Sequence, residues 1–261
     1  MSSTDATDDR VHTNRVRAES FGSLAADYDR TRPSYPPDLI DDLVQSAPRD
    51  ALDVGCGTGK ASVLLMARGV SVLGIEIDER MAEVARGHGV PVEVAAFESW
   101  DDRGRTFDLI TCAQAWHWVD PVVGSARASS LLRPGGGLAL FWNFVELDDA
   151  TQAAMDAAYA SAAPHLLPDS VVRGRGSATV SGHVADLRAA GLSVEYRGYP
   201  WDLDYSADEW LAMIATHSDH SALPAPQRDA VFTAMRAAIE SIGGIVPAHY
   251  VTHALICRHG S

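Results

Sequence analysis

Gly55, Gly57 and Gly59 alternate with other residues between a short apolar run and a stretch with helical spacing. Glycine in such a turn permits positive φ angles and lets the backbone come close to a ligand. The N-terminus of the following helix presents free N–H groups, which suit a phosphate or a carboxylate. A turn without a ligand would need fewer glycines, so this spacing predicts a nucleotide or an amino-acid carboxylate at the loop.

An acid, Glu76, ends the next apolar run, roughly 20 residues after the first glycine, where dinucleotide folds place a ribose-binding acid. A carboxylate can accept hydrogen bonds from the 2′ and 3′ hydroxyls of a ribose together. An isolated acid at the end of a strand is usually only solvated. Together with the glycine loop, Glu76 predicts a site for a nucleoside.

Trp116, His117 and Trp118 follow a further apolar run, at residues 107–113. His117 is the best candidate for a catalytic base, since imidazole titrates near neutral pH. We expect Trp116 and Trp118 to contact the substrate. The alternative is that both tryptophans are packing residues and that His117 is a hydrogen-bonded spacer.

Histidines and aromatic residues recur in the last third of the chain. His217 and His220 are three residues apart and would share one face of a continuous helix. No third ligand has suitable spacing, so we expect no metal and assign Tyr205, His217 and His220 to substrate binding, with surface exposure as the alternative. His249 and His253 would share one face of the last strand, in a structural role.

These residues must be positioned by elements that alternate between strand and helix. Such alternation favours βαβ units and a mainly parallel sheet, with right-handed crossovers and with ligands at the carboxyl ends of the strands. Strands are expected at 51–54, 70–77, 92–96, 107–113, 138–142, 193–201 and 249–258, and helices at 15–30, 38–47, 60–67, 78–86, 122–132, 149–163, 181–190, 207–216 and 227–242. The later helices interrupt the alternation and predict a helical cap over the carboxyl edge of the sheet.

The 261 residues carry a formal net charge of −14, and Lys60 is the only lysine. Without a basic cluster, nucleic acid and anionic membranes are disfavoured as partners. The three cysteines are odd in number and scattered, which argues against disulfides or a zinc site and favours a reducing, cytoplasmic location. No signal peptide and no run long enough to span a membrane is found. The oligomeric state is left open between monomer and homodimer.

The residues at 51–59, Ala-Leu-Asp-Val-Gly-Cys-Gly-Thr-Gly, resemble motif I of class I S-adenosylmethionine-dependent methyltransferases, including the acid at position 53. Residues 106–110 and 132–136 resemble the family's entry to strand four and its turn before strand five. Leader residues resemble a small-molecule subgroup that includes trans-aconitate methyltransferase-like proteins: Phe21, Ala25, Tyr28, Asp29, Arg32, Pro33, Tyr35 and Pro36.

The resemblance implies S-adenosyl-L-methionine as cofactor, S-adenosyl-L-homocysteine as product, and a Rossmann-like fold. It implies that the loop Gly55-Cys56-Gly57-Thr58-Gly59 passes under the methionine part of the cofactor. Asp53 would order that loop or meet the amino group, Glu76 would hold the ribose, and Ile77 would pack on the adenine.

Further contacts follow from the same resemblance. Phe97 and Glu98 would lie at the adenine edge. Ala96 stands where many members have an aspartate, so that contact is either missing or made by Glu98. Ala113 and Gln114 would lie near the sulfonium.

The leader would close over the cofactor through Tyr28 and Arg32, with Arg32 facing the cofactor carboxylate. The alternative for both residues is a leader helix packed at the surface. On this organisation, residues 1–14 are a disordered tail and residues 15–261 form one domain. Its parts are capping helices at 15–48, a cofactor-binding core at 49–143, a helical cap at 144–248 around strand six, and the last strand at 249–258.

The reaction implied is methyl transfer to an O, N or C nucleophile of a small molecule. Residues 113–116 lack the Asn/Asp-Pro-Pro-aromatic motif of enzymes that methylate exocyclic amines, and no Pro-Cys follows strand four. The aromatic residues of the cap favour a planar or partly polar acceptor. Two alternatives stay open: an NAD(P)-dependent oxidoreductase, which the glycine spacing disfavours, and a non-catalytic protein that binds S-adenosylmethionine.

Overall fold

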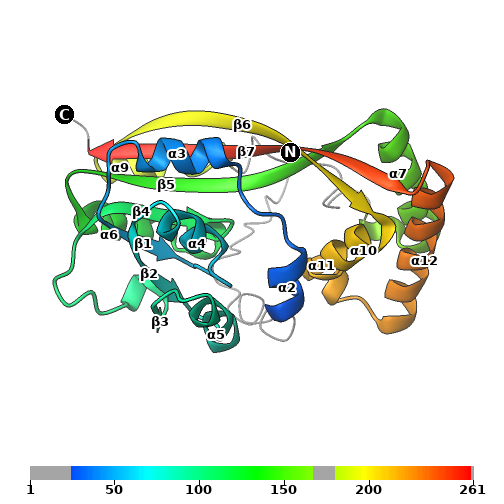
Figure 1. Ribbon diagram of the computed structural model, residues 1–261, viewed down its shortest axis with the longest axis horizontal. Helices are drawn as coiled ribbons and strands as arrows, with labels where there is room; N and C mark the ends of the chain where they lie inside the picture. Colours follow the sequence, from blue (N-terminus) through cyan, green and yellow to red (C-terminus); the bar gives the residue numbers. More distant parts are fainter. Residues whose placement is uncertain (1–24, 167–179, 260–261) are drawn as a thin grey trace, which may run out of the picture.

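One seven-stranded sheet organises the computed structural model, which describes residues 25–166 and 180–259 (Figure 1). The sheet order is β3-β2-β1-β4-β5-β7-β6, and β7 runs antiparallel to both of its neighbours while all other pairs are parallel. The strands are β1 (Asp50–Val54), β2 (Ser71–Glu76), β3 (Val92–Val94), β4 (Phe107–Ala113), β5 (Leu132–Leu147), β6 (Leu192–Ser206) and β7 (Ile245–His259). The predicted mostly parallel, Rossmann-like sheet is thereby confirmed.

Helices cover both faces of this sheet and build the cap. They are α2 (Ala25–Thr31), α3 (Pro37–Val44), α4 (Lys60–Met66), α5 (Glu79–Gly87), α6 (Pro121–Leu131), α7 (Asp149–Ala162), α9 (Val184–Ala189), α10 (Ala207–Ala215), α11 (Ser218–Ser221) and α12 (Ala225–Ser241). Short 3-10 turns lie at η3 (Phe97–Ser99), η4 (Trp116–Trp118) and η5 (Pro164–Leu166). The tail expected at 1–14, and most of the helix expected at 15–30, lie outside the described residues.

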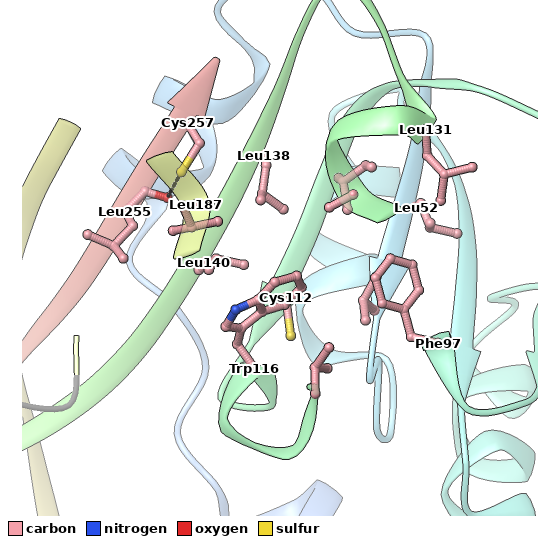
Figure 2. Close-up of a cluster of buried hydrophobic side chains, with 14 of the residues drawn as sticks. Leu52, Phe97, Cys112, Trp116, Leu131, Leu138, Leu140, Leu187, Leu255 and Cys257 are labelled. Carbon is pink, nitrogen blue, oxygen red and sulfur yellow. Dashed lines mark hydrogen bonds between the residues drawn. The ribbon is translucent and has the colours of Figure 1, made fainter. Parts of the chain in front are cut away.

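The core has one hydrophobic cluster on each face of the sheet. Leu39 of α3 and Leu65 of α4 pack on one face, and Leu131 of α6 and Leu187 of α9 pack on the other. Figure 2 shows the second cluster, where Leu131 and Leu187 meet residues of β1, β4, β5 and β7. Alternate residues of one strand therefore face opposite layers, as the pleat requires.

The last three strands are much longer than predicted and carry the cap. Beyond Phe141, which pairs with the last residue of β4, β5 continues to Leu147 alongside β7, and β6 continues to Ser206. Figure 1 shows these strands leaving the rest of the sheet and reaching α7, α10 and α12. A third hydrophobic cluster joins the extended strands to these helices, through Met155, Trp210 and Met235 among others.

Two local expectations need correction. The glycine-rich turn expected between α6 and strand five lies within β5, where the register shifts from Phe107–Leu132 to Leu109–Gly137 and leaves the residues between as a bulge. The helix expected at 207–216 forms, but His217 and His220 do not lie on one continuous helix. It ends at Ala215, and α11 begins at Ser218.

Candidate active site

A cavity of about 520 Å³ lies at the carboxyl ends of the parallel strands, between the sheet, the leader and the cap. Small-molecule sites in proteins usually measure roughly 300–1,000 Å³. Its wall comes from loops that follow β1, β2, β3 and β4, from α2, from the extended part of β5, and from the cap. It is therefore placed where the fold predicts a ligand.

The glycine loop forms the floor of this cavity at the end of β1. Gly55, Gly57 and Gly59 have φ angles of +62°, +56° and +86°, which residues with a Cβ atom rarely adopt. A Cβ on Gly55 would lie 2.6 Å from the Cβ of Ala115, which follows β4. Gly55, Cys56 and Gly57 line the cavity, whereas Gly59 lies outside the lining and packs against α5 and Val90.

Glu76 ties the end of β2 to the glycine loop. Its Oε2 accepts from the N–H of Gly57 at 2.8 Å, and its Oε1 accepts from the N–H groups of Ile77 and Asp78 at 2.9 and 3.0 Å. The side chain lines the cavity, although Glu76 as a whole is only 8% exposed. Burial raises the pKa of Glu76, and the three backbone N–H groups oppose that rise by stabilising the carboxylate.

Asp53 lies beneath the loop and does not line the cavity. It is fully buried, and it accepts from the hydroxyls of Ser62 and Thr111 at 2.5 and 2.9 Å. Burial raises the pKa of Asp53 to about 6. Of its two expected roles, this geometry supports ordering of the loop, because Asp53 joins β1 to α4 and β4.

The expected adenine pocket is assembled from the segments after β2 and β3. Ile77, Ala96, Phe97 and Glu98 all line the cavity. Glu98 uses one oxygen to accept from the N–H of Asp120 at 2.8 Å. The Glu98 carboxylate is therefore held in place near Ala96, whose own side chain cannot form hydrogen bonds.

The last residue of β4, Ala113, lines the cavity, and the segment after β4 adds Gln114, His117 and Trp118. Gln114 has a φ of +61°, and its N–H donates to the carbonyl of Phe141 at 2.9 Å. A non-glycine residue held in this conformation is typical of functional sites. The imidazole of His117 and the indole of Trp118 have centroids 4.9 Å apart.

The substrate role expected for Trp116 is wrong. Its side chain is fully buried and outside the cavity lining. Figure 2 shows its indole within the hydrophobic cluster, near Cys112 and Leu140. The 3-10 turn η4 points Trp116 into the core while its two successors reach the cavity, so the packing alternative holds for Trp116 alone.

The leader contributes Tyr28, Arg32 and Tyr35 to the wall. Arg32 turns toward the cap: its Nε donates to the Thr216 hydroxyl at 2.8 Å and its Nη2 to the Thr216 carbonyl at 3.1 Å. Its guanidinium carbon lies 5.0 Å from the centroid of the Tyr28 ring. The leader is thus bound to the cap, rather than packed freely at the surface.

The cap contributes His217 and Met213, and the extended β7 contributes Tyr250. The Nε2 atom of His217 lies 3.2 Å from the sulfur of Met213. Burial lowers the pKa of His217 well below its usual range, and the charges of Arg32 and His220 lower it further. The surroundings of His217 at the cavity wall therefore favour the neutral form of its imidazole.

The substrate roles expected for His220 and Tyr205 are also wrong. His220 is buried behind the wall, with Nε2 2.9 Å from the Tyr159 hydroxyl and Nδ1 2.8 Å from Asp219. The Tyr205 hydroxyl pairs with that of Tyr250 at 2.9 Å inside the cap. The break between α10 and α11 separates the faces of His217 and His220, which the sequence spacing did not reveal.

Several lining residues escaped the sequence analysis. Lys60 begins α4, lines the cavity and donates to the Asp29 carbonyl at 2.5 Å. Its place directly after the glycine loop was a usable signal. Tyr35 belongs to the leader residues that carry the resemblance, but no role was assigned to it. Asn143 and Tyr250 gave no such signal, because they enter the cavity only through the extended strands. Among the described residues, no group of His, Cys, Asp and Glu could hold a metal ion, and no helix is long and apolar enough to cross a membrane.

Residues 51–136 match a family model described as a methyltransferase domain. An uncharacterized methyltransferase of Mycobacterium tuberculosis is 42% identical over 134 residues, which are 50% of this chain and 55% of that protein. A ubiquinone biosynthesis O-methyltransferase of Saccharophagus degradans is 31% identical over 107 residues, which are 38% of this chain and 45% of that protein. The chain thus spans about half the length of the curated relatives it matches.

Solved structures support the same fold over more of the chain. A protein described as a type II methyltransferase from Anaeromyxobacter dehalogenans has a TM-score of 0.63 at 26% identity, covering 86% of this chain and 97% of its own. A phosphoethanolamine N-methyltransferase of Haemonchus contortus, solved with S-adenosyl-L-methionine, has a TM-score of 0.53 at 13% identity. The match covers 94% of this chain and 60% of that protein's chain. Residues 51–136 therefore match a methyltransferase domain, and the chain as a whole shares the Rossmann-like fold of these solved methyltransferases. The resemblance to trans-aconitate methyltransferase-like proteins stays a prediction.

Proposed function

We propose that this chain transfers a methyl group from S-adenosyl-L-methionine to a small-molecule acceptor by in-line displacement. The match of residues 51–136 to a methyltransferase domain supports the reaction class. The observation that carries the proposal is the coupling of Glu76 to Gly57 at the floor of a 520 Å³ cavity. That pair places a carboxylate that suits a ribose beside a glycine-rich backbone that suits an attached amino acid, at the ends of β1 and β2.

The residues present fit this cofactor. The positive φ angles of Gly55 and Gly57 leave room for the methionine part. Glu76 accepts three backbone N–H groups, so its Oε2 atom keeps one lone pair for a ribose hydroxyl. Ile77 and Phe97 offer apolar contacts for the adenine, and Glu98 offers a carboxylate. When bound, the cofactor supplies a methyl group on a positively charged sulfur, so the leaving group needs no activation by the protein.

The chain's own task is then to orient the acceptor and exclude water. Ala113 and Gln114 line the cavity at the end of β4, where the resemblance places the sulfur. His117 follows them and is our candidate for a base when the acceptor loses a proton during the reaction. A base role for His117 requires that His117→Ala lowers turnover at saturating acceptor. Near-wild-type turnover would leave His117 as a wall residue.

Labelled methyl transfer tests this function. The purified protein is incubated with methyl-labelled S-adenosyl-L-methionine and a small-molecule extract of cells, and labelled products are identified by mass spectrometry. We expect a labelled small molecule and an equal amount of S-adenosyl-L-homocysteine. Binding of the cofactor without any labelled product across such extracts would instead support a non-catalytic binding protein.

A further inference from the structure

The strand β5 extends beyond its neighbour β4. The last residue of β4, Ala113, pairs with Phe141, whereas β5 continues to Leu147 alongside β7 (Figure 1). One edge of β5 therefore has no strand partner after Phe141. Residues 143–145 of this stretch line the cavity, so part of the cavity wall is the edge of a strand.

The pairing pattern fixes which main-chain groups turn toward that edge. The N–H of Gln114 donates to the carbonyl of Phe141 at 2.9 Å, so the main-chain groups of Phe141 point toward β4. Along a strand these groups point alternately to one neighbour and to the other, and the register of β5 with β7 runs on without a shift. The groups of Phe144 therefore point toward β7. Those of Asn143 and Val145 point to the side where β4 has ended.

These main-chain groups of Asn143 and Val145, here called the free edge of β5, have no hydrogen-bond partner within residues 25–166 and 180–259. Val145 is nevertheless buried, and buried main-chain N–H and C=O groups in proteins are almost always paired. A molecule in the cavity must therefore complete them. An edge strand offers a row of alternating donors and acceptors, which an extended main chain can match.

The side chain of Asn143 holds the free edge in position. Its Nδ2 donates to the carbonyl of Ser34 at 2.9 Å, and its Oδ1 accepts from the hydroxyl of Thr252 at 2.6 Å. That hydroxyl oxygen in turn accepts from the indole N–H of Trp201 at 2.9 Å. The free edge is thus tied to the leader, β7 and β6, which lowers the cost of ordering it when a ligand binds.

The free edge lies away from the expected nucleoside. The strand order across this part of the sheet is β2-β1-β4-β5. Glu76 at the end of β2 and the glycine loop at the end of β1 are therefore on one side of β4, and the free edge is on the other. Ala113, at the end of β4, is where the resemblance places the sulfur. A molecule bound along the free edge would then lie next to the methyl group.

The alternation of donor and acceptor selects the chemical group that can bind. In an antiparallel pair, the N–H and C=O of one residue exchange two hydrogen bonds with those of one partner residue. An amine offers only donors and a carboxylate only acceptors. Either would leave one main-chain group of Asn143 unpaired, which costs binding free energy.

We propose that the acceptor is a peptide-type small molecule, which carries the N–H and C=O of one amino-acid residue and pairs through them with Asn143 on the free edge of β5. The inference rests on the methyl transfer proposed above. It names the group that positions the acceptor, and the methylated atom is a neighbouring one that this pairing brings to the end of β4.

Matched probes test this pairing on protein saturated with S-adenosyl-L-homocysteine. The Kd is measured by NMR titration for N-acetyl-L-leucine methylamide, for its analogue with an ester oxygen in place of the leucine N–H, and for N-acetylisopentylamine, which lacks the leucine carbonyl. We expect the diamide to bind about tenfold more tightly than either analogue, because each analogue leaves one group of the free edge unpaired. Equal Kd values, or no binding of the diamide, would overturn the proposal.

Two substitutions at one position separate the main-chain N–H from the side chain. Asn143→Ala removes the side-chain contacts and keeps the N–H, whereas Asn143→Pro removes both and breaks no bond to β7. The diamide should bind Asn143→Pro about tenfold more weakly than Asn143→Ala. N-acetylisopentylamine should bind the two variants alike, since it has no carbonyl for that N–H. Equal affinity of the diamide for both variants would show that the main-chain N–H is not used.

Stability tests the direction assigned to the main-chain groups. Phe144→Pro removes a hydrogen bond to β7, so its urea midpoint should fall well below that of Phe144→Ala. The midpoint of Asn143→Pro should stay much closer to that of Asn143→Ala, because the lost N–H faces the cavity. The opposite order would contradict a free edge at Asn143.

Binding of S-adenosyl-L-homocysteine distinguishes the two proposals. Its Kd should differ less than about threefold between Asn143→Pro and Asn143→Ala. A large loss confined to Asn143→Pro would assign the free edge to the cofactor and overturn the inference. If wild type binds S-adenosyl-L-homocysteine but not the diamide, the acceptor class fails and the methyltransferase proposal stands. If it binds no S-adenosyl-L-homocysteine, the proposed function fails first.

Discussion

At the scale of single residues, Glu76 has a structural role in the glycine loop besides the expected binding of a ribose. Its two oxygens accept from the N–H groups of Gly57, Ile77 and Asp78, so the carboxylate fixes the shape of the loop that also contacts the ligand. Sequence reasoning found Glu76 from its place after a strand. It did not reveal this second task, which depends on how β1 and β2 align.

Glu76→Gln should therefore weaken binding of S-adenosyl-L-homocysteine by roughly 10–100-fold, because an amide nitrogen would face a backbone N–H and one ribose contact would be lost. Isothermal titration calorimetry measures the change in Kd. Glu93→Gln is the matched control, since Glu93 lies on the neighbouring β3, binds Arg105 and Trp100, and is outside the cavity lining. An unchanged Kd in Glu76→Gln would remove the ribose role.

The raised pKa of Asp53 predicts that the free energy of unfolding depends on pH. Burial raises the pKa of Asp53 from 3.8 to about 6 in the folded protein. Ionising the Asp53 carboxylate therefore costs more in the folded protein than in the unfolded chain. Below about pH 4 Asp53 is protonated in both the folded and the unfolded protein. The free energy of unfolding then falls as pH rises, and this loss is complete once pH has passed about 6. The full difference is about 3 kcal/mol.

Asp53→Asn removes this titration and keeps one of the two oxygens that accept from Ser62 and Thr111. The free energy of unfolding of the variant, relative to wild type, should rise between about pH 4 and 6 and then stay constant. Urea denaturation at several pH values measures it, with the exposed Asp204→Asn as a surface control. A difference between Asp53→Asn and wild type that does not change with pH would contradict a raised pKa.

At the scale of elements, the short turn η4 divides neighbouring residues between two tasks. Trp116 is fully buried in the core, while Trp118 lines the cavity. Trp116→Ala should lower the free energy of unfolding by about 3–5 kcal/mol, through loss of packing and creation of a cavity. Trp118→Ala should cost only about 1 kcal/mol, and should raise the KM for the acceptor. Similar losses of stability in both variants, measured by urea denaturation, would contradict this division.

Regular elements were predictable where one periodicity governs the whole segment. Residues 107–113 form β4 as expected, and Asp78 caps α5 through the N–H of Arg80. The end of β5 was not predictable. Residues such as Val145 are buried by cap helices distant in sequence, so their burial depends on tertiary packing. A longer strand with one bulge does not leave a distinct pattern in the sequence.

At the scale of the whole molecule, the chain has a core with a glycine loop and a cap carried on extended strands. The two parts have separate hydrophobic clusters, with Trp210, Met235 and Tyr159 fully buried in the cap. Arg32 and Thr216 join the leader to the cap across the cavity. The cofactor half of the site could therefore be predicted from local motifs. The acceptor half could not, because it exists only where leader, β5, β7 and α10 meet.

Trp210→Ala should destabilise the cap without affecting the cofactor site. Loss of the indole from the cap should cost about 3–5 kcal/mol and should increase amide exchange in α10 and α12. The Kd for S-adenosyl-L-homocysteine should change less than threefold, roughly 0.6 kcal/mol, because β1 and α4, which flank the glycine loop, pack in the other clusters. A parallel loss of cofactor affinity would show that the cap and the cofactor site fold as one unit.

Calorimetric titration of the wild-type protein, separately with S-adenosyl-L-homocysteine and with NAD, tests the central claim most directly. Glu76 suits the ribose of either ligand, so the two titrations compare the candidate functions at the same residues. We predict that S-adenosyl-L-homocysteine binds with one site per chain and that NAD gives no measurable heat. Binding of NAD alone would contradict the account and identify the cavity as a dinucleotide site.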